Sequence, residues 1–238
     1  SHPVYWTPRT QIRLGGYFVN RWSETTLFGE PFSFTKGVIN GETKLTIMRF
    51  TQEFVDRTED RVIAARSTFS FGLDALGATN DTGKPDAKFA SWLGQLQYFR
   101  RFNDLIELVY RTDVQVASDP LFSIEQYAVG GINTVRGFRE NLIVRDSALV
   151  ASIEPRFTVY RQPLPLIGDE ERDGVVQIAP FFDYGRAWSA DGNRIPANNL
   201  ASVGLGVRWQ PFGNMQTELY WGYKVLDPEI EVQNKTLQ

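Results

Sequence analysis

The sequence contains no cysteine and only one histidine, His2, beside the first residue. Without thiolates the chain has neither a disulfide framework nor a cysteine metal site. A single histidine near the terminus cannot provide a multi-histidine metal site or the base of a Ser-His-Asp triad. We therefore expect no catalytic residue, no metal and no cofactor.

Long apolar runs and a strong charge of one sign are also missing. No stretch approaches the roughly 18 consecutive apolar residues of a membrane helix, and the mean hydropathy is −0.28. A low mean hydropathy is nevertheless compatible with membrane β-strands, which alternate lipid-facing and lumen-facing residues. The net charge of −3 gives no support for nucleic-acid binding. Residues 1–5 lack the features of a signal peptide, so either a signal peptide has been removed or the chain begins within a longer protein.

Aromatic residues are abundant, at 13% of the chain. Tryptophans lie near the ends of several apolar segments, as expected for the aromatic girdles of a membrane barrel: Trp22, Trp92, Trp188, Trp209 and Trp221. Composition alone fits an aromatic-rich soluble β-sandwich equally well, so the arrangement of the residues has to decide.

Apolar and polar residues alternate with a period of two over segments of about 10 to 14 residues, which predicts β-strands. In 61–74, for example, Phe69 and Phe71 share one face, while Thr68 and Ser70 share the other. The clear segments are 61–74, 90–101, 105–117, 148–160, 200–210 and 215–225. Less regular ones are 11–22, 43–57 and 175–188, and 122–130 is short. We expect about ten strands.

The length of these strands and of their connections favours a membrane barrel. Soluble strands average about five or six residues, whereas a tilted strand needs about 9–11 to cross hydrocarbon. Some connections are short, such as 58–60 and 102–104, and others are long: 24–42, 75–88, 131–146 and 161–174. Short turns at one end and long loops at the other are typical of outer-membrane barrels. The predicted fold class is an all-β, antiparallel transmembrane β-barrel.

Two strings resemble enzyme motifs only superficially. Asp81-Thr82-Gly83 spells an aspartic-protease triplet, but it lies in a polar loop and has no second copy to share a proton. The stretch from Gly77 to Lys84 approaches a phosphate-binding loop, with one residue too many and Pro85 where a hydroxyl should hold Mg²⁺.

The informative stretch is Val135-Arg136-Gly137-Phe138. It resembles the VRG(F/Y) signature of the inward-folded loop in the superfamily of outer-membrane protein translocases and assembly factors. The preceding Gly130-Gly131 resembles the glycine pair of that family. The following Arg145-Asp146-Ser147-Ala148-Leu149 resembles its "GD-x-G" return, although the glycines are replaced.

A second motif, Phe181-Phe182-Asp183-Tyr184-Gly185, matches the F-x-D-x-G pattern of the same superfamily. The resemblance implies that Asp183 is the partner of Arg136. The alternation in 175–188 independently places Phe181, Asp183 and Gly185 on the lumen face. If Asp183 is not the partner of Arg136, Glu154 in the segment 148–160 is the next candidate. Farther on, 204–209 resembles the family's "GxGxR(W/F)" strand.

Within this superfamily the whole chain most resembles TpsB, the two-partner secretion transporters of the haemolysin/haemagglutinin-activator type. The resemblance implies an outer-membrane location and a barrel of about 16 strands preceded by a pair of periplasmic POTRA domains. It also implies export of a large exoprotein, with the VRGF loop regulating the channel. Residues 1–238 would then be strands six to fifteen, without the POTRA domains and the first strands. The last strand would be missing too, because Thr236-Leu237-Gln238 does not end in the family's aromatic residue.

The expected partners are the secreted exoprotein and outer-membrane lipid, with no nucleic acid and no small-molecule substrate. One alternative is a barrel insertase or assembly factor of the same superfamily, which shares both motifs. Another is an outer-membrane enzyme such as a lipase, which the shortage of histidine disfavours.

Overall fold

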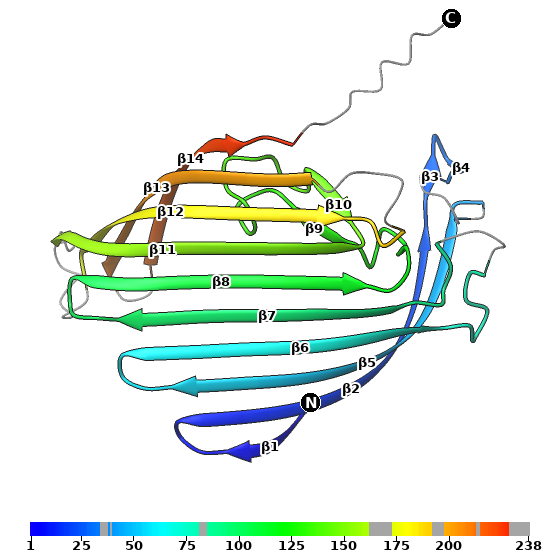
Figure 1. Ribbon diagram of the computed structural model, residues 1–238, viewed down its shortest axis with the longest axis horizontal. Helices are drawn as coiled ribbons and strands as arrows, with labels where there is room; N and C mark the ends of the chain where they lie inside the picture. Colours follow the sequence, from blue (N-terminus) through cyan, green and yellow to red (C-terminus); the bar gives the residue numbers. More distant parts are fainter. Residues whose placement is uncertain are drawn as a thin grey trace, which may run out of the picture.

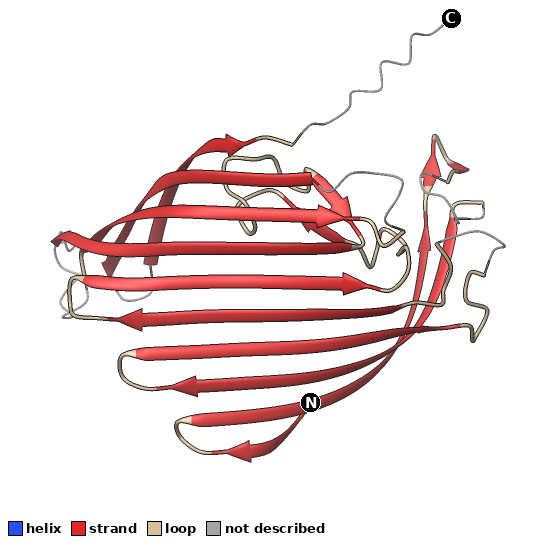
Figure 2. Ribbon diagram, in the orientation of Figure 1, coloured by secondary structure: helices blue, strands red, loops and turns tan. Residues whose placement is uncertain are grey.

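A computed structural model of the chain describes residues 1–33, 38, 40–80, 85–161, 173–191, 198–212 and 215–228. Asp81-Thr82-Gly83, the terminal Thr236-Leu237-Gln238 and most of the 161–174 connection lie outside the described residues. The described part of the chain consists of strands and their connections (Figure 2). It has no helix long and apolar enough to span a membrane.

Ten antiparallel strands form one curved sheet (Figure 1), in the order β1-β2-β5-β6-β7-β8-β11-β12-β13-β14. The first five are β1 (His2–Trp6), β2 (Thr10–Glu24), β5 (Glu42–Arg57), β6 (Arg61–Leu73) and β7 (Ala90–Arg101). The others are β8 (Ile106–Ala117), β11 (Ser147–Arg161), β12 (Val175–Trp188), β13 (Asn198–Phe212) and β14 (Met215–Leu226). All except β1 have 12 to 16 residues, enough to cross hydrocarbon.

Two small hairpins lie outside this sheet: β3 (Thr26–Leu27) with β4 (Glu30–Pro31), and β9 (Tyr127–Val129) with β10 (Ile143–Arg145). The expectation of a wall strand at 122–130 is therefore wrong. Its apolar residues Phe122 and Val129 are buried against other parts of the wall instead. The tenth wall strand is β1, which was not among the expected segments.

The connections largely follow the expected alternation. The turns 58–60 and 102–105 lie at the left end of the sheet in Figure 1, and the β2–β5, β6–β7 and β8–β11 connections lie at the right end. The 162–174 connection is an exception. Its flanking residues Arg161 and Val175 are paired at the end that carries the short turns.

The two faces of the sheet differ sharply in polarity. Phe69, Trp92 and Val116 follow one another across β6, β7 and β8, and they are 37%, 36% and 46% exposed. The opposite face, which the β8–β11 connection covers, is here called the inner face. It carries buried polar residues, among them Ser70, Gln115, Ser152, Glu154, Asp183 and Ser202. Exposed apolar residues outside and buried polar residues inside are the arrangement of a membrane barrel and the reverse of a soluble sandwich.

Two apolar clusters hold connections against the inner face. One joins Leu45 and Ile47 of β5 to Leu121 and Phe122, at the start of the β8–β11 connection. The other joins wall residues of β11–β13 to the middle of the same connection and contains Val129, Val135, Phe138, Ile143, Ala148, Val150, Ala187 and Leu200. The β8–β11 connection thus lies inside the curve of the wall.

Because the outer face of β6 is apolar, Phe69→Arg in the full-length protein should lower the free energy of unfolding by about 2–4 kcal/mol if the site lies near the bilayer midplane. Thr68→Arg, on the inner face of the same strand, should cost much less. Thr68 is a better control than Gln115 or Ser202, which are 8% and 0% exposed. Chemical unfolding from lipid vesicles measures both changes, and equal costs on the two faces would contradict a membrane barrel.

Candidate functional site

The β8–β11 connection, residues 118–146, is pinned at its base by Asp146, which is 2% exposed. Its carboxylate accepts hydrogen bonds from the backbone N–H groups of Leu121 and Ala190 and from Nε2 of Gln126, each at 2.9 Å. Losing the partners of a buried polar group is costly, so these bonds hold their donors in place. The base of the connection is therefore fixed to the ends of the wall strands.

Tight backbone turns present the motif residues to the wall. Gly130 and Gly131 have φ values of 112° and 102°, and the Gly130 N–H donates to Oγ1 of Thr134 at 2.8 Å. Gly131 in turn donates its N–H to the carbonyl of Val135 at 3.2 Å. Such positive φ values favour glycine. Arg136 follows directly after this compact turn.

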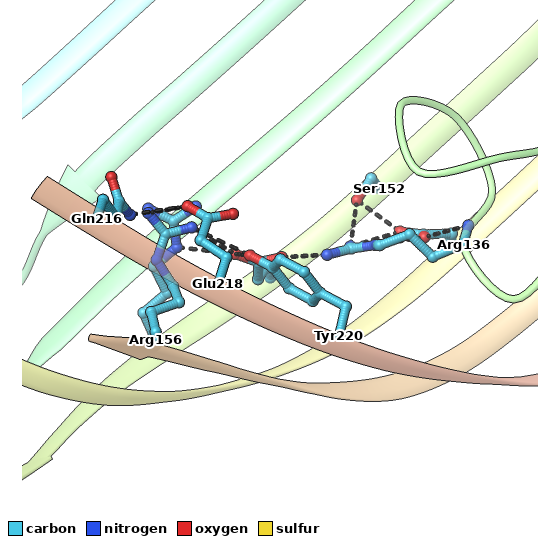
Figure 3. Close-up of polar contacts among 9 residues, drawn as sticks. Arg136, Ser152, Arg156, Gln216, Glu218 and Tyr220 are labelled. Atoms are coloured by element: carbon cyan, nitrogen blue, oxygen red, sulfur yellow. Dashed lines mark hydrogen bonds and ion pairs between the residues drawn. The ribbon is translucent and has the colours of Figure 1, made fainter. Parts of the chain in front are cut away.

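Arg136 and Asp183 form a bidentate ion pair in the interior. Nε and Nη2 of Arg136 donate to the two carboxylate oxygens of Asp183, both at 2.8 Å, and the Arg136 backbone N–H donates to Oδ2 at 3.0 Å. Ser152 donates its hydroxyl to Oδ1 at 2.6 Å and accepts from Nη2 at 3.1 Å (Figure 3). The planar fork of the guanidinium matches both carboxylate oxygens at once, which an ammonium group cannot do.

Glu154 binds the remaining side of the guanidinium. One of its oxygens accepts a hydrogen bond from Nη1 of Arg136. The other accepts from Nε of Arg156 at 2.8 Å and from the hydroxyl of Tyr220 at 3.3 Å, and it lies 3.8 Å from Nη1 of Arg208. Glu154 is therefore a simultaneous partner of Arg136, whereas the sequence suggested it as a substitute for Asp183.

Two aromatic rings cover the guanidinium. Its carbon lies 3.6 Å from the ring centroid of Phe181 and 4.9 Å from that of Tyr220. Burial alone lowers the pKa of Arg136, but the bonds and charges of Asp183 and Glu154 outweigh it and raise the pKa above the ordinary value. The motif phenylalanine of F-x-D-x-G thus stacks on the motif arginine, which stays charged.

Glycines on the wall leave room for the loop. A Cβ atom on Gly185 would lie 2.6 Å from a methyl of Val129 and 2.8 Å from one of Val135. A Cβ on Gly222 of β14 would lie 2.9 Å from the backbone nitrogen of Gly137 and 3.0 Å from its Cα. A side chain at Gly185 would have to displace these valine methyls, and one at Gly222 would have to displace the backbone of the loop.

The structure brings all the predicted site residues together. Val135, Phe138, Phe181 and Gly185 surround the buried ion pair or anchor the loop beside it. Sequence reasoning missed Ser152, Tyr220 and Gly222 as parts of the site. The only available signal was the alternation of residues along the strands. It placed Ser152 on the lumen face, and it placed Gly222 there too, because the neighbouring Trp221 and Tyr223 point outward.

A cavity of about 470 Å³ lies beside the site, and its lining includes Gln97, Arg111, Arg156 and Glu218. Charged residues of both signs therefore face the space next to the loop. Among the described residues, no group of three or more His, Cys, Asp or Glu could hold a metal ion.

The family model described as "Haemolysin secretion/activation protein ShlB/FhaC/HecB" matches residues 36–209. The outer membrane transporter CdiB of Dickeya dadantii (strain 3937) is 35% identical over 150 residues, which are 60% of this chain and 25% of that protein. The structure of CdiB from Escherichia coli matches with a TM-score of 0.77 at 20% identity, over 96% of this chain and 40% of that one. The chain spans less than half of either relative, and the structural match shows a shared β-barrel fold.

Because Arg136 and Asp183 act as one pair, Arg136→Ala and Asp183→Ala should each alter single-channel conductance of the full-length protein. The double variant should differ little from either single variant. Arg136→Lys should restore little, because an ammonium cannot bond both oxygens of Asp183 and one of Glu154 together. Effects that add in the double variant would mean that the two residues act separately.

The contact between Gly137 and Gly222 yields a second prediction. Gly222→Ala places a methyl group against the backbone of Gly137, which has no flexible side chain to move away. The loop should shift, and limited proteolysis of the folded protein should cut it faster than in the wild type. Gly16→Ala on β2 is the matched control, because a Cβ there would meet no atom within 4 Å. Equal protection of both variants would contradict the close approach.

Proposed function

Because the chain belongs to the haemolysin secretion/activation (ShlB/FhaC/HecB) family, whose members are bacterial outer-membrane β-barrel transporters, we propose that it forms part of a two-partner secretion channel. A secreted exoprotein would pass through the lumen of the barrel. The loop that carries Val135-Arg136-Gly137-Phe138 would regulate the channel.

The observation that carries this proposal is the buried pairing of Arg136 with Asp183 and Glu154 on the inner face of the wall. The loop carrying Arg136 lies in the space through which a client would have to travel. A loop held by directional charged bonds has a defined position and can leave it only when those bonds break together. This is the property required of an element that sets the state of a pore.

The chemistry of the inner face suits an extended polypeptide. Charges of both signs, including Arg111, Glu154, Arg156, Arg208 and Glu218, are paired within the wall or line its cavity. Such a charged surface would stay hydrated and bind a passing unfolded chain only weakly. Folding of the exoprotein outside the cell would then provide the free energy for its export.

Membership of the transporter family favours export over the insertion of other barrels, although insertases share the two motifs. It also favours a transporter over an outer-membrane enzyme. The contacts around Arg136 leave the guanidinium engaged with protein groups, which fits a role in positioning the loop.

Secretion of the exoprotein tests this function. Cells producing the full-length protein and its exoprotein should release at least about tenfold less exoprotein with Asp183→Ala, which leaves Arg136 without its bidentate partner. The matched control is Glu53→Ala, which removes an inner-face carboxylate paired with Arg66 at 3.5 Å. Heat-modified mobility on gels verifies that both variants assemble. Normal secretion by an assembled Asp183→Ala protein would refute a role for this pair in export.

A further inference from the structure

A second buried carboxylate, Glu125, holds the same loop at a different part of the wall. Glu125 lies in the turn before β9, and its side chain is only 7% exposed. One carboxylate oxygen accepts a hydrogen bond from Nη1 of Arg21 at 3.1 Å, and the other accepts from Nη2 of Arg49. The carboxylate is thus shared between arginines of β2 and β5.

The two arginines lie on neighbouring strands, on either side of an apolar pair. Arg21 is paired in register with Leu45, and Arg49 with Tyr17, so the two guanidiniums flank the Val19–Ile47 pair on the inner face. Ile47 also belongs to the apolar cluster that receives Leu121 and Phe122. The first part of the loop therefore docks on β2 and β5 through apolar contacts and, a few residues later, through a shared carboxylate.

The two ionic sites lie far apart around the wall. Glu125 reaches β2 and β5, whereas Arg136 reaches β11 and β12, and β6, β7 and β8 lie between them in the sheet. The backbone carbonyl of Glu125 also accepts a hydrogen bond from Nε2 of Gln115 on β8, at 3.1 Å. The loop consequently bridges the inner face from β5 to β12.

We infer that Glu125 is a second positioning residue of the loop: the Arg21–Glu125–Arg49 cluster holds the first half of the loop independently of the Arg136–Asp183 pair, and the lumen opens fully only when both are released. This inference rests on the proposed function, since it concerns the loop that would regulate the channel. Breaking the motif pair alone would leave the loop tethered across the lumen at Glu125.

Loop position is measured directly by spin-label distances in the full-length protein in lipid vesicles. Residues 1–238 contain no cysteine, so introduced ones are readily labelled. Exposed Glu59, in the β5–β6 turn, provides the reference; exposed Ser123 reports on the first half of the loop and exposed Asn133 on the second. The label pairs are Glu59→Cys with Ser123→Cys, and Glu59→Cys with Asn133→Cys.

Glu125→Gln keeps the size of the side chain and removes its charge. It should broaden the distribution of distances between residues 59 and 123 and leave that between residues 59 and 133 nearly unchanged. Asp183→Asn should instead broaden the 59–133 distribution and leave the 59–123 distribution nearly unchanged. Arg49→Gln, which leaves Arg21 in place, should give a smaller effect than Glu125→Gln. The control Glu53→Gln removes an inner-face charge of β5 that pairs with Arg66, and it should change neither distance.

Conductance without any exoprotein gives the second measurement. Each single variant should raise it slightly, and Glu125→Gln with Asp183→Asn should raise it at least about threefold above the product of the single effects, because only the double variant frees both halves. An unchanged distance to residue 123 in Glu125→Gln, or a double variant that merely multiplies the single effects, overturns the inference. If distances and conductance respond as expected while secretion stays normal, Glu125 does position the loop and the proposed role in export fails.

Discussion

A guanidinium removed from water needs opposite charges and hydrogen-bond acceptors within the protein. The inner structure of this chain depends on how Arg136 obtains them. Removing one partner of such a buried pair typically costs about 3–5 kcal/mol, because the other charge is left unpaired. Asp183, Glu154 and Ser152 satisfy the guanidinium from two adjacent strands, and Phe181 covers its face. The part of the loop that carries Arg136 is therefore held against β11 and β12.

The polarity of the wall makes this arrangement possible. With the apolar residues facing outward, the inner face is free to carry carboxylates and hydroxyls at positions that a soluble sandwich would fill with aliphatic side chains. Close approach of the loop adds a steric condition, which Gly185 and Gly222 fulfil. Charge and space are thus matched at the same site, and neither alone would fix the loop.

The alternation of apolar and polar residues determined the strands and their faces, since successive side chains of a strand point to opposite sides. The segment predicted at 175–188 is β12, Val175–Trp188, with Asp183 on the inner face as expected. The resemblance to a family, carried by two short motifs, indicated the partner of Arg136. The segment 122–130 was misassigned: its apolar residues Phe122 and Val129 pack on the wall from inside and do not form part of it.

The sequence by itself therefore determined the all-β class, most of the wall strands, their lipid-facing side and the inner-face position of Asp183, and a family resemblance pointed to Arg136 as its partner. Only the tertiary structure decided that Glu154 binds Arg136 at the same time, that Gly222 meets Gly137, and that Glu125 reaches Arg21, 104 positions earlier in the chain. Alternation is a local property that any strand displays on its own. These contacts instead depend on the register and curvature of the sheet, which bring distant residues together only once the wall has formed.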